Sequence, residues 1–315
     1  MATSGSINYN QTRDEIISDA LQLIGVLGEG ETASANAITF CSSFLNKMIK
    51  MWHAQGIHCF TETEGTLFLQ TGINEYTISM DTSLDKAGIN TIETQLSADA
   101  SGASLSVDST TGMTAADNIS IALDDGTIHT TTIVSVDSST ALTITSALAS
   151  AAATDNWVFA YTNKVMKPLM VESARIRNTA GNDNRIKVMG RTEFMRIPNK
   201  SSQGNNITAL YYSPQRDTGK FYTWPTPTDS NYRIKFSYLR HMEDFDASGN
   251  NPDLPQEWLE ALTYGLAIRV APSYGIKISK DFPELLMAAR EFKEQLETWD
   301  AEEGSIYARP NTECH

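Results

Sequence analysis

Two series of apolar residues at helical spacing stand near the start of the chain. Thr12 and Glu15 have the spacing of a capping box before the first series, and Gly28 stands where that helix would end. Thr32 or Ser34 is placed to cap the second series, which continues to a further glycine. The connection between the two series is short, so the pattern predicts an antiparallel pair of helices.

A second pair of helical series occupies residues 251–299. Pro255 stands where the first turn of a helix tolerates proline, and Pro272 stops the series that follows it. Asp281 has the spacing to Glu284 that caps a further helix with one apolar stripe. We expect these two helices to close a four-helix bundle with the two helices near the start of the chain.

Between the helical pairs the period of the apolar residues changes to two, which is typical of β-strands. Residues 66–69 and 75–78 flank a segment of turn composition and predict a β-hairpin. Residues 191–196 are interpreted as a short helix. Further strands of an antiparallel sheet are expected at residues 172–177, 186–189, 209–212, 220–224 and 232–238.

Residues 95–163 are interpreted as an insert within this β domain. Alternating strands are expected at residues 104–107, 119–123, 131–136, 141–144 and 157–161. Short strands at such even spacing predict a small β-barrel or sandwich. Asp124, Asp125 and Gly126, between two of these strands, have the composition of a hairpin turn.

The insert also stands apart in charge. Residues 87–163 contain eight Asp or Glu and no Lys or Arg, whereas the whole chain has a formal net charge of −14. A break in charge density of this kind indicates a separate module. A chain this acidic is a poor candidate for wrapping nucleic acid, because tight binding to phosphate relies on clustered Lys and Arg.

The expected fold class is α+β, with a four-helix bundle made by the N- and C-terminal hairpins and a central antiparallel β domain that carries the inserted β-barrel or sandwich. The expected domains are an N-terminal helical hairpin (1–64), the central β domain (65–94 and 164–250), the acidic insert (95–163), a C-terminal helical hairpin (251–303) and a C-terminal arm (304–315). The arm loses helical periodicity and contains Pro310, so we expect it to become ordered only against a partner.

Composition supports a globular chain of more than one domain. The sequence has 315 residues, of which 41% are hydrophobic. No apolar run approaches the ~18 to 20 residues that a membrane-spanning helix needs, and the first residues lack the pattern of a secretory signal. Cys41, Cys59 and Cys314 are too scattered for a disulfide framework, so we interpret them as reduced thiols of a protein made in a cytoplasm.

No constellation of residues predicts an enzyme active site. His53, His58 and Cys59 come nearest to a metal set, but their spacing matches no zinc motif. Glu62 or Glu64 could supply the acid of a glycosidase, although the sequence offers no positioned pair of carboxyl groups. We therefore expect no catalytic residue, no bound metal and no cofactor.

A cluster of basic residues follows the insert. The candidate residues are Arg175, Arg177, Arg185, Lys187, Arg191 and Arg196. These side chains would line a passage for DNA or pair with acids of a neighbouring subunit. We favour the pairing with acids, because the chain is acidic overall and has few basic clusters, whereas tight binding to phosphate relies on clustered Lys and Arg.

Four short stretches are informative through their order along the chain. They are Ala20-Leu21-Gln22-Leu23-Ile24-Gly25-Val26, Gly190-Arg191-Thr192-Glu193-Phe194, Tyr222-Thr223-Trp224-Pro225-Thr226-Pro227 and Leu254-Pro255-Gln256-Glu257-Trp258. In this order they resemble the head-to-tail adaptor proteins of short-tailed bacteriophages. The resemblance covers both helical hairpins and the domain between them. The insert departs from the pattern, so no role is carried over to it.

The resemblance implies a structural protein that forms a ring of twelve subunits under the portal protein, at the head-tail junction of a virion made in the cytoplasm of a host bacterium. Such a ring extends the DNA channel, lets genomic DNA pass without tight binding and presents a platform for tail nozzle or fibre proteins. No membrane is implied. In similar proteins the C-terminal arm climbs onto the portal, and here it would dock through Ile306, Tyr307 and Arg309.

Two other functions are kept as alternatives. A tail-associated peptidoglycan hydrolase would use Glu62 or Glu64 as its acid, and it predicts a cleft with a carboxyl pair and a measurable lytic activity. A carbohydrate-binding or decoration role would reside in the insert alone.

Overall fold

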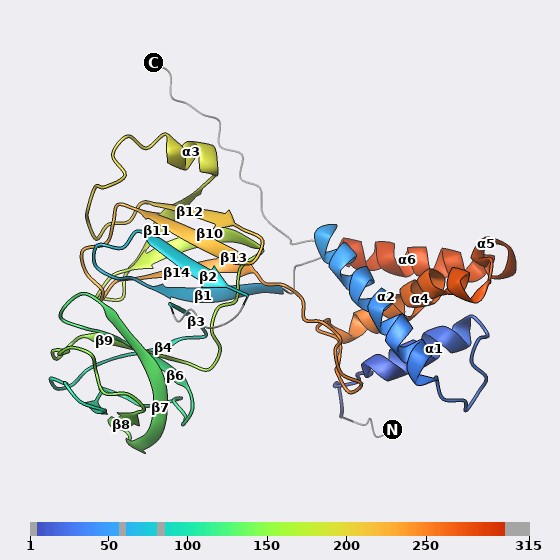
Figure 1. Ribbon diagram of the computed structural model, residues 1–315, viewed down its shortest axis with the longest axis horizontal. Helices are drawn as coiled ribbons and strands as arrows, with labels where there is room; N and C mark the ends of the chain where they lie inside the picture. The colour runs from blue at the N-terminus through green and yellow to red at the C-terminus, as the bar shows by residue number, and fades with distance from the viewer. Residues whose placement is uncertain (1–4, 57–60, 81–85, 300–315) are drawn as a thin grey trace. The chain divides into compact units, whose positions relative to one another are not determined.

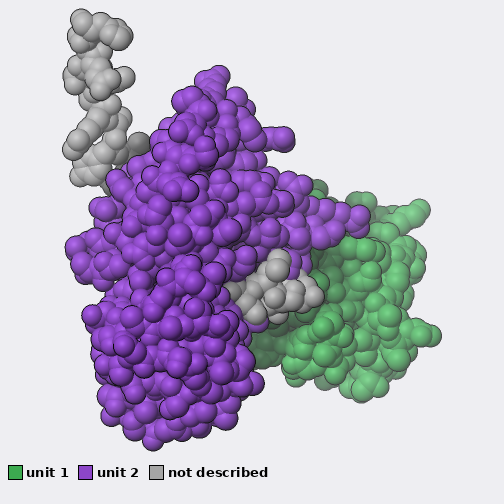
Figure 2. Space-filling model, turned by 60° about the vertical axis from the view of Figure 1, so that its left-hand side comes forward, with its two compact units in different colours: residues 1–61, 242–315 green, residues 62–241 purple. Residues whose placement is uncertain are grey.

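The computed structural model describes residues 5–56, 61–80 and 86–299 (Figure 1). The chain groups into two compact units, which are coloured separately in Figure 2. One unit joins residues 1–61 to 242–315, and the other comprises residues 62–241. The first unit is helical and the second is built on two β-sheets, so the expected α+β class is confirmed. The finer division into domains stays a prediction.

The helical unit draws its elements from both ends of the chain. They are α1 (Arg13–Leu23), α2 (Ala35–Ala54), η2 (Gln256–Trp258), α4 (Leu259–Val270), η3 (Ala271–Tyr274), α5 (Ile278–Asp281) and α6 (Pro283–Trp299). The backbone N–H of Thr12 donates to the Glu15 carboxylate (2.7 Å), as the predicted capping box requires. The backbone N–H of Ala37 donates to the Ser34 hydroxyl (3.3 Å), so Ser34 rather than Thr32 caps α2.

Helix α4 contacts α1, α2 and α6 within the helical unit. It is apolar on most sides, and Leu262 and Leu266 are fully buried. Gly265 permits the close approach of α2, because a Cβ at that position would lie 3.0 Å from Sδ of Met48 and 3.2 Å from the ring of Trp52. One apolar core therefore joins helices from the two ends of the chain.

Two predicted helix boundaries are wrong. Helix α1 ends at Leu23 rather than before Gly28, because Gly25 has a φ of +71° and turns the chain there. Asp281 lies inside α5 and accepts a backbone hydrogen bond at the start of that helix (2.9 Å), so it does not cap α6. The reason is Pro283, since proline disfavours a helical conformation in the residue before it and is tolerated in the first turn of a new helix.

The larger sheet of the second unit has the strand order β2-β13-β12-β11-β10-β14-β1-β3. Its strands are β1 (Glu62–Phe68), β2 (Glu75–Ser79), β3 (Ala87–Ile89), β10 (Met170–Arg177), β11 (Asp183–Met189), β12 (Ala209–Pro214), β13 (Thr218–Trp224) and β14 (Arg233–Leu239). All neighbours are antiparallel except β11 and β12, which are parallel and are connected through α3 (Arg191–Met195).

The two edges of this sheet are joined by the segment that precedes β10. The backbone N–H of Val165 donates to the carbonyl of Ala87 in β3 (3.0 Å), and that of Lys167 donates to the carbonyl of Ser79 at the end of β2 (3.1 Å). The larger sheet is therefore barrel-like and surrounds an apolar core of its own.

The β-hairpin expected from residues 66–69 and 75–78 is wrong. Strand β1 pairs with β14 on one side and β3 on the other, while β2 pairs with β13. The Tyr76 hydroxyl holds the connection between β1 and β2, because it accepts from the backbone N–H of Gln70 (2.9 Å) and donates to the carbonyl of Ile73 (2.9 Å). Alternation identified the strands, but it carries no information about partners distant in sequence.

The smaller sheet has the strand order β4-β9-β6-β7-β8-β5. Its strands are β4 (Ile92–Gln95), β5 (Ser104–Ser106), β6 (Asn118–Ala122), β7 (Ile128–Ser138), β8 (Ala141–Ile144) and β9 (Trp157–Tyr161). A bridge between Leu96 and Val107 joins the ends of β4 and β5, so the sheet closes into a small barrel around its own core. The sequence predicted all these strands except β4.

The acidic side chains of the small barrel serve largely as acceptors for its own turns and strands. Those that accept hydrogen bonds from nearby backbone N–H or side-chain groups are Asp99, Asp117, Asp124, Asp125 and Asp137. The Thr127 hydroxyl and backbone N–H, for example, donate to Asp125 and hold the pKa of that carboxyl below its usual value. Hydrogen bonds within the turns and strands of the small barrel therefore explain why many of its residues are Asp.

Candidate functional site

Glu93 on β4 lies where the small barrel meets the larger sheet, and three cations surround its carboxylate. Nε of Arg233 donates to Oε2 (3.1 Å), Nζ of Lys235 lies 2.9 Å from Oε1, and Nη1 of Arg177 lies 3.6 Å from Oε2. The side chain of Arg233 is 1% exposed and that of Glu93 is 13% exposed. A carboxylate this far from water requires such partners, because an unpaired buried charge is strongly destabilising.

Two more acids extend these contacts into an ionic network across β1, β10, β11 and β14. The register of β10 and β14 places two pairs of cations opposite each other: Arg175 with Lys235, and Arg177 with Arg233. Asp183 accepts hydrogen bonds from Nε of Arg177 (2.7 Å) and Nε of Arg175 (3.0 Å). Arg175 also pairs with Glu64. Four cations thus share three carboxylates on the face opposite the apolar core.

Aromatic side chains from the small barrel complete this junction. The guanidinium of Arg233 lies 3.9 Å from the ring centroid of Trp157, which is the geometry of a cation–π contact. Phe68 on β1 stacks on Phe159 with a centroid distance of 4.7 Å, and it also contacts Tyr161 at 5.4 Å. The larger sheet and the small barrel are therefore held together by charge pairs and by a buried aromatic cluster.

The network sets the protonation of its buried groups. Burial alone would raise the pKa of Glu93, but the hydrogen bond and charge of Arg233, followed by those of Lys235, outweigh burial and hold the pKa below the ordinary 4.5. The hydrogen bond from Arg177 lowers the pKa of Asp183 in the same way. Both acids are therefore carboxylates at neutral pH.

Folding stability is expected to fall when this network is acidified. The ordinary pKa, which applies to the unfolded chain, is 4.5 for Glu93 and 3.8 for Asp183, and folding lowers both. A carboxyl group with a lowered pKa in the folded state stabilises the fold fully above its unfolded-state pKa. This stabilisation is lost as the pH falls through the folded-state pKa. The thermal midpoint should therefore be steady above about pH 5 and decline below it. The decline should be shallower in a Glu93→Gln variant, and an equal decline in both proteins would remove Glu93 from the explanation.

The six basic residues predicted as one cluster divide into two groups. Arg175 and Arg177 belong to the ionic network, and Lys187 pairs with Glu193 on α3. The others are exposed and form no ion pair with any residue that the structure describes: Arg185, Arg191 and Arg196. Of the predicted cluster, this second group is therefore the part that is accessible to a partner.

Sequence reasoning missed Glu93, Arg233 and Lys235. Alternation along β14 carried a signal for the two cations, because Ile234 and Phe236 occupy the apolar positions between and beside them. Glu93 had no such signal, since β4 is four residues long and pairs with β9, more than sixty residues further along the chain.

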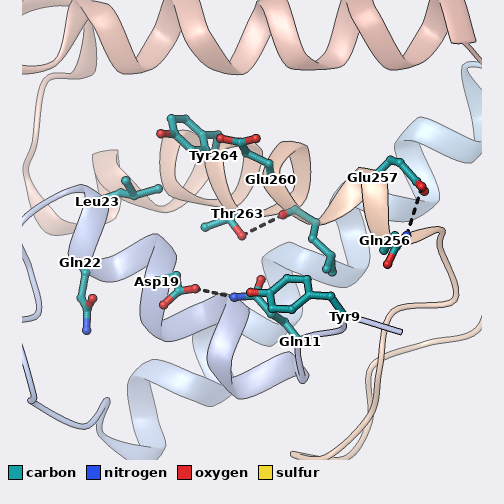
Figure 3. Close-up of a pocket in the computed structure, with 11 residues that line it drawn as sticks. Tyr9, Gln11, Asp19, Gln22, Leu23, Gln256, Glu257, Glu260, Thr263 and Tyr264 are labelled. Atoms are coloured by element: carbon teal, nitrogen blue, oxygen red, sulfur yellow. Dashed lines mark hydrogen bonds between the residues drawn. The ribbon is translucent and has the colours of Figure 1, made fainter. Parts of the chain in front are cut away.

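A groove of about 680 Å³ lies on the helical unit between α1 and α4 (Figure 3). Its α1 side presents Asp19, and its other side presents Glu257 from η2 and Glu260 from α4. Tyr9 and Tyr264 contribute aromatic surface. No Lys or Arg is among the described residues that line the groove, so it is acidic.

The other candidate residues show no catalytic arrangement in the part of the chain that the structure describes. Within residues 5–56, 61–80 and 86–299, no three His, Cys, Asp or Glu side chains are grouped so that they could hold a metal ion. Glu64 is paired within the ionic network. Several predicted residues lie outside the described residues: His58, Cys59, Cys314, Ile306, Tyr307 and Arg309.

Comparison with known proteins identifies one family. A family model described as SU10 adaptor protein matches residues 115–311, which is more than half of the chain. The match runs from within the small barrel through β10 to β14 and the C-terminal helices. No curated protein matches the chain. Among the described residues, no helix is both long and apolar enough to cross a membrane.

Proposed function

Because the chain belongs to the SU10 adaptor protein family, which confirms the resemblance to bacteriophage adaptor proteins, we propose that it forms the adaptor ring between the portal and the tail of a virion. In this role twelve copies dock beneath the portal protein and extend its DNA channel. The opposite side of the ring receives the tail nozzle or fibre proteins. The family match is the observation that carries the proposal.

We further propose that α1, α2, α4 and α6 form the four-helix bundle of the adaptor. Support comes from the single apolar core that these helices share and from the contacts of α4 with the other three. The insert is proposed to be a module on the outside of the ring. No catalytic activity is proposed, and the pairing of Glu64 with Arg175 and Lys235 supports a structural role for that carboxylate.

Removal of the C-terminal arm is expected to abolish portal binding. The arm supplies Ile306, Tyr307 and Arg309 as the proposed anchors on the portal. A chain that ends at residue 303 should remain folded by circular dichroism but no longer co-sediment with purified portal protein. A chain that ends at Pro310 keeps all three anchors and serves as the matched control. Undiminished binding by the shorter chain would remove the arm from the interface.

Weak binding to duplex DNA is also expected. The channel wall of an adaptor has to let DNA pass, and the net charge of −14 disfavours phosphate binding. In an anisotropy titration at ~0.15 M salt, the affinity should be weaker than the ~10⁻⁴ to 10⁻⁶ M of ordinary nonspecific binders. Micromolar binding that is abolished by Arg191→Ala together with Arg196→Ala would instead identify a DNA site.

A further inference from the structure

The connection from β11 to β12, which we call the α3 loop (residues 190–208), is firmly attached to the larger sheet. The ring of Phe194 on α3 packs against Tyr211 at a centroid distance of 5.5 Å. Nε1 of Trp224 donates a hydrogen bond to the carbonyl of Asn199 (2.7 Å). Figure 1 shows α3 next to β12 at one side of the larger sheet. A projection held at two points loses little conformational freedom when it binds a partner.

The exposed side chains of the α3 loop combine positive charge with apolar surface. Arg191 and Arg196 are exposed at the two ends of α3 and form no ion pair with a described residue. Met195 lies between them and is 54% exposed. Arg and Met are both enriched where protein surfaces meet. The guanidinium of Arg pairs with a carboxylate through two parallel hydrogen bonds, while the stem of the side chain packs on apolar surface.

The charges of the chain are divided between its parts in a complementary way. Residues 62–86 and 164–241, which form the larger sheet and its connections, contain 15 Lys or Arg and 10 Asp or Glu. Residues 1–61 and 242–315, which make up the helical unit, contain 9 Lys or Arg and 20 Asp or Glu. One chain therefore carries both a basic part and a strongly acidic part.

The acidic groove of the helical unit has the chemistry that the α3 loop requires. Glu257 and Glu260 are exposed on its edge and have no cation within ion-pair distance among the described residues. Tyr264 offers apolar and aromatic surface beside Glu260 (Figure 3). The acids of the small barrel are a poorer match, because much of their hydrogen-bonding capacity is used within that barrel.

We propose that the α3 loop of one copy docks into the acidic groove of the next copy, with Arg191 and Arg196 paired to Glu257 and Glu260. A second copy is the partner because both complementary surfaces are present on this one chain. The contact joins unlike surfaces, and a repeated contact of this kind closes a ring when the rotation between copies allows it. The inference rests on the proposed function, since it assigns the subunit contact of the adaptor ring.

Charge reversal in the full chain tests the contact. Arg191→Glu with Arg196→Glu, or Glu257→Arg with Glu260→Arg, places like charges opposite each other and should weaken association between copies by at least about 100-fold. The chain with all four substitutions restores opposite charges and should regain assembly. Arg216→Glu is the control, because Arg216 is an exposed cation outside the loop. Association is measured by analytical ultracentrifugation and by the number of copies bound per portal ring.

Complete rings formed by either charge-reversed variant would overturn the proposed contact. Failure of the fourfold variant to assemble, although circular dichroism shows that it is folded, would also overturn it. Neither result would argue against binding of the chain to the portal. Loss of duplex DNA binding in the loop variant, with unchanged ring assembly, would also overturn the proposed contact and assign the loop to DNA. Failure of the unaltered chain to bind portal at all would instead contradict the proposed function itself, and the subunit contact with it.

Discussion

Replacement of Glu93 by Gln is expected to destabilise the second unit by about 3 kcal/mol, near the lower end of the cost of breaking a buried ion pair. Gln keeps the shape of the side chain but removes its charge. Arg233, which is 1% exposed, and Lys235 would then remain buried with no carboxylate in contact with both. At about 2–4 °C per kcal/mol for a unit of this size, the thermal midpoint should fall by about 6–12 °C.

Glu62→Gln is the matched control for this prediction. Glu62 lies on β1 in the same sheet, is exposed, and forms no ion pair with a described residue. Its replacement should change the free energy of unfolding by less than about 0.5 kcal/mol. Hydrogen exchange would locate the effect, because the Glu93 variant should open first at β4 and β9. Equal midpoints for both variants would show that the network contributes little to folding.

Excision of residues 95–163, with a short Gly-Ser linker in their place, is expected to leave a folded chain that still binds portal protein. The backbone N–H of Ile89 donates to the carbonyl of Asn163 (2.9 Å), so the chain leaves and re-enters the larger sheet at adjacent positions. The excised chain retains Glu93, the partner of Arg233 and Lys235 in the intact protein, although β4 loses its neighbouring strand β9. The larger sheet also has its own apolar core.

The excised chain should nevertheless be less stable. Phe68 is 1% exposed in the intact protein and loses both Phe159 and Tyr161 when the insert is removed. Exposing a buried Phe side chain costs about 1.5–3 kcal/mol. Removal of the insert also leaves Phe68 as exposed apolar surface, which favours aggregation. A Phe68→Thr substitution in the excised chain should therefore improve its solubility without changing portal binding. An excised chain that does not fold would show that the insert belongs to the core of the second unit.

Local sequence patterns predicted the elements of this fold better than they predicted its pairings. Capping at Thr12 and Ser34, and most strands of both sheets, follow from periodicity and short-range hydrogen bonding. The pairing of β2 with β13 depends on contacts between Tyr76 and Phe221, which are far apart in sequence. From sequence, β1 and β2 were expected to pair with each other as a hairpin, and only the strand pairing in the folded structure excludes this.

The same limit applies to the candidate site. The basic residues on β10, on β11 and around α3 were visible as a run in sequence, and the exposed Arg191 and Arg196 remain candidates for contact with a partner. Two of their acidic partners could not be recognised in this way, because Glu64 and Glu93 are distant in sequence and are brought beside Arg175 and Arg177 by the fold. Asp183, the acid that pairs with both arginines from β11, is near them in sequence. A charge cluster in sequence therefore cannot be assigned to an interface before its own chain's acids are located.

The most direct test of the adaptor function is an electron cryomicroscopy reconstruction of the full chain mixed with the portal protein of the same virus. We expect one closed ring of twelve copies on one face of the portal, coaxial with its channel, with the C-terminal arm of each copy on the portal surface. Copies that bind the portal singly without contacting one another, or a chain that does not bind it at all, would contradict the proposed adaptor function.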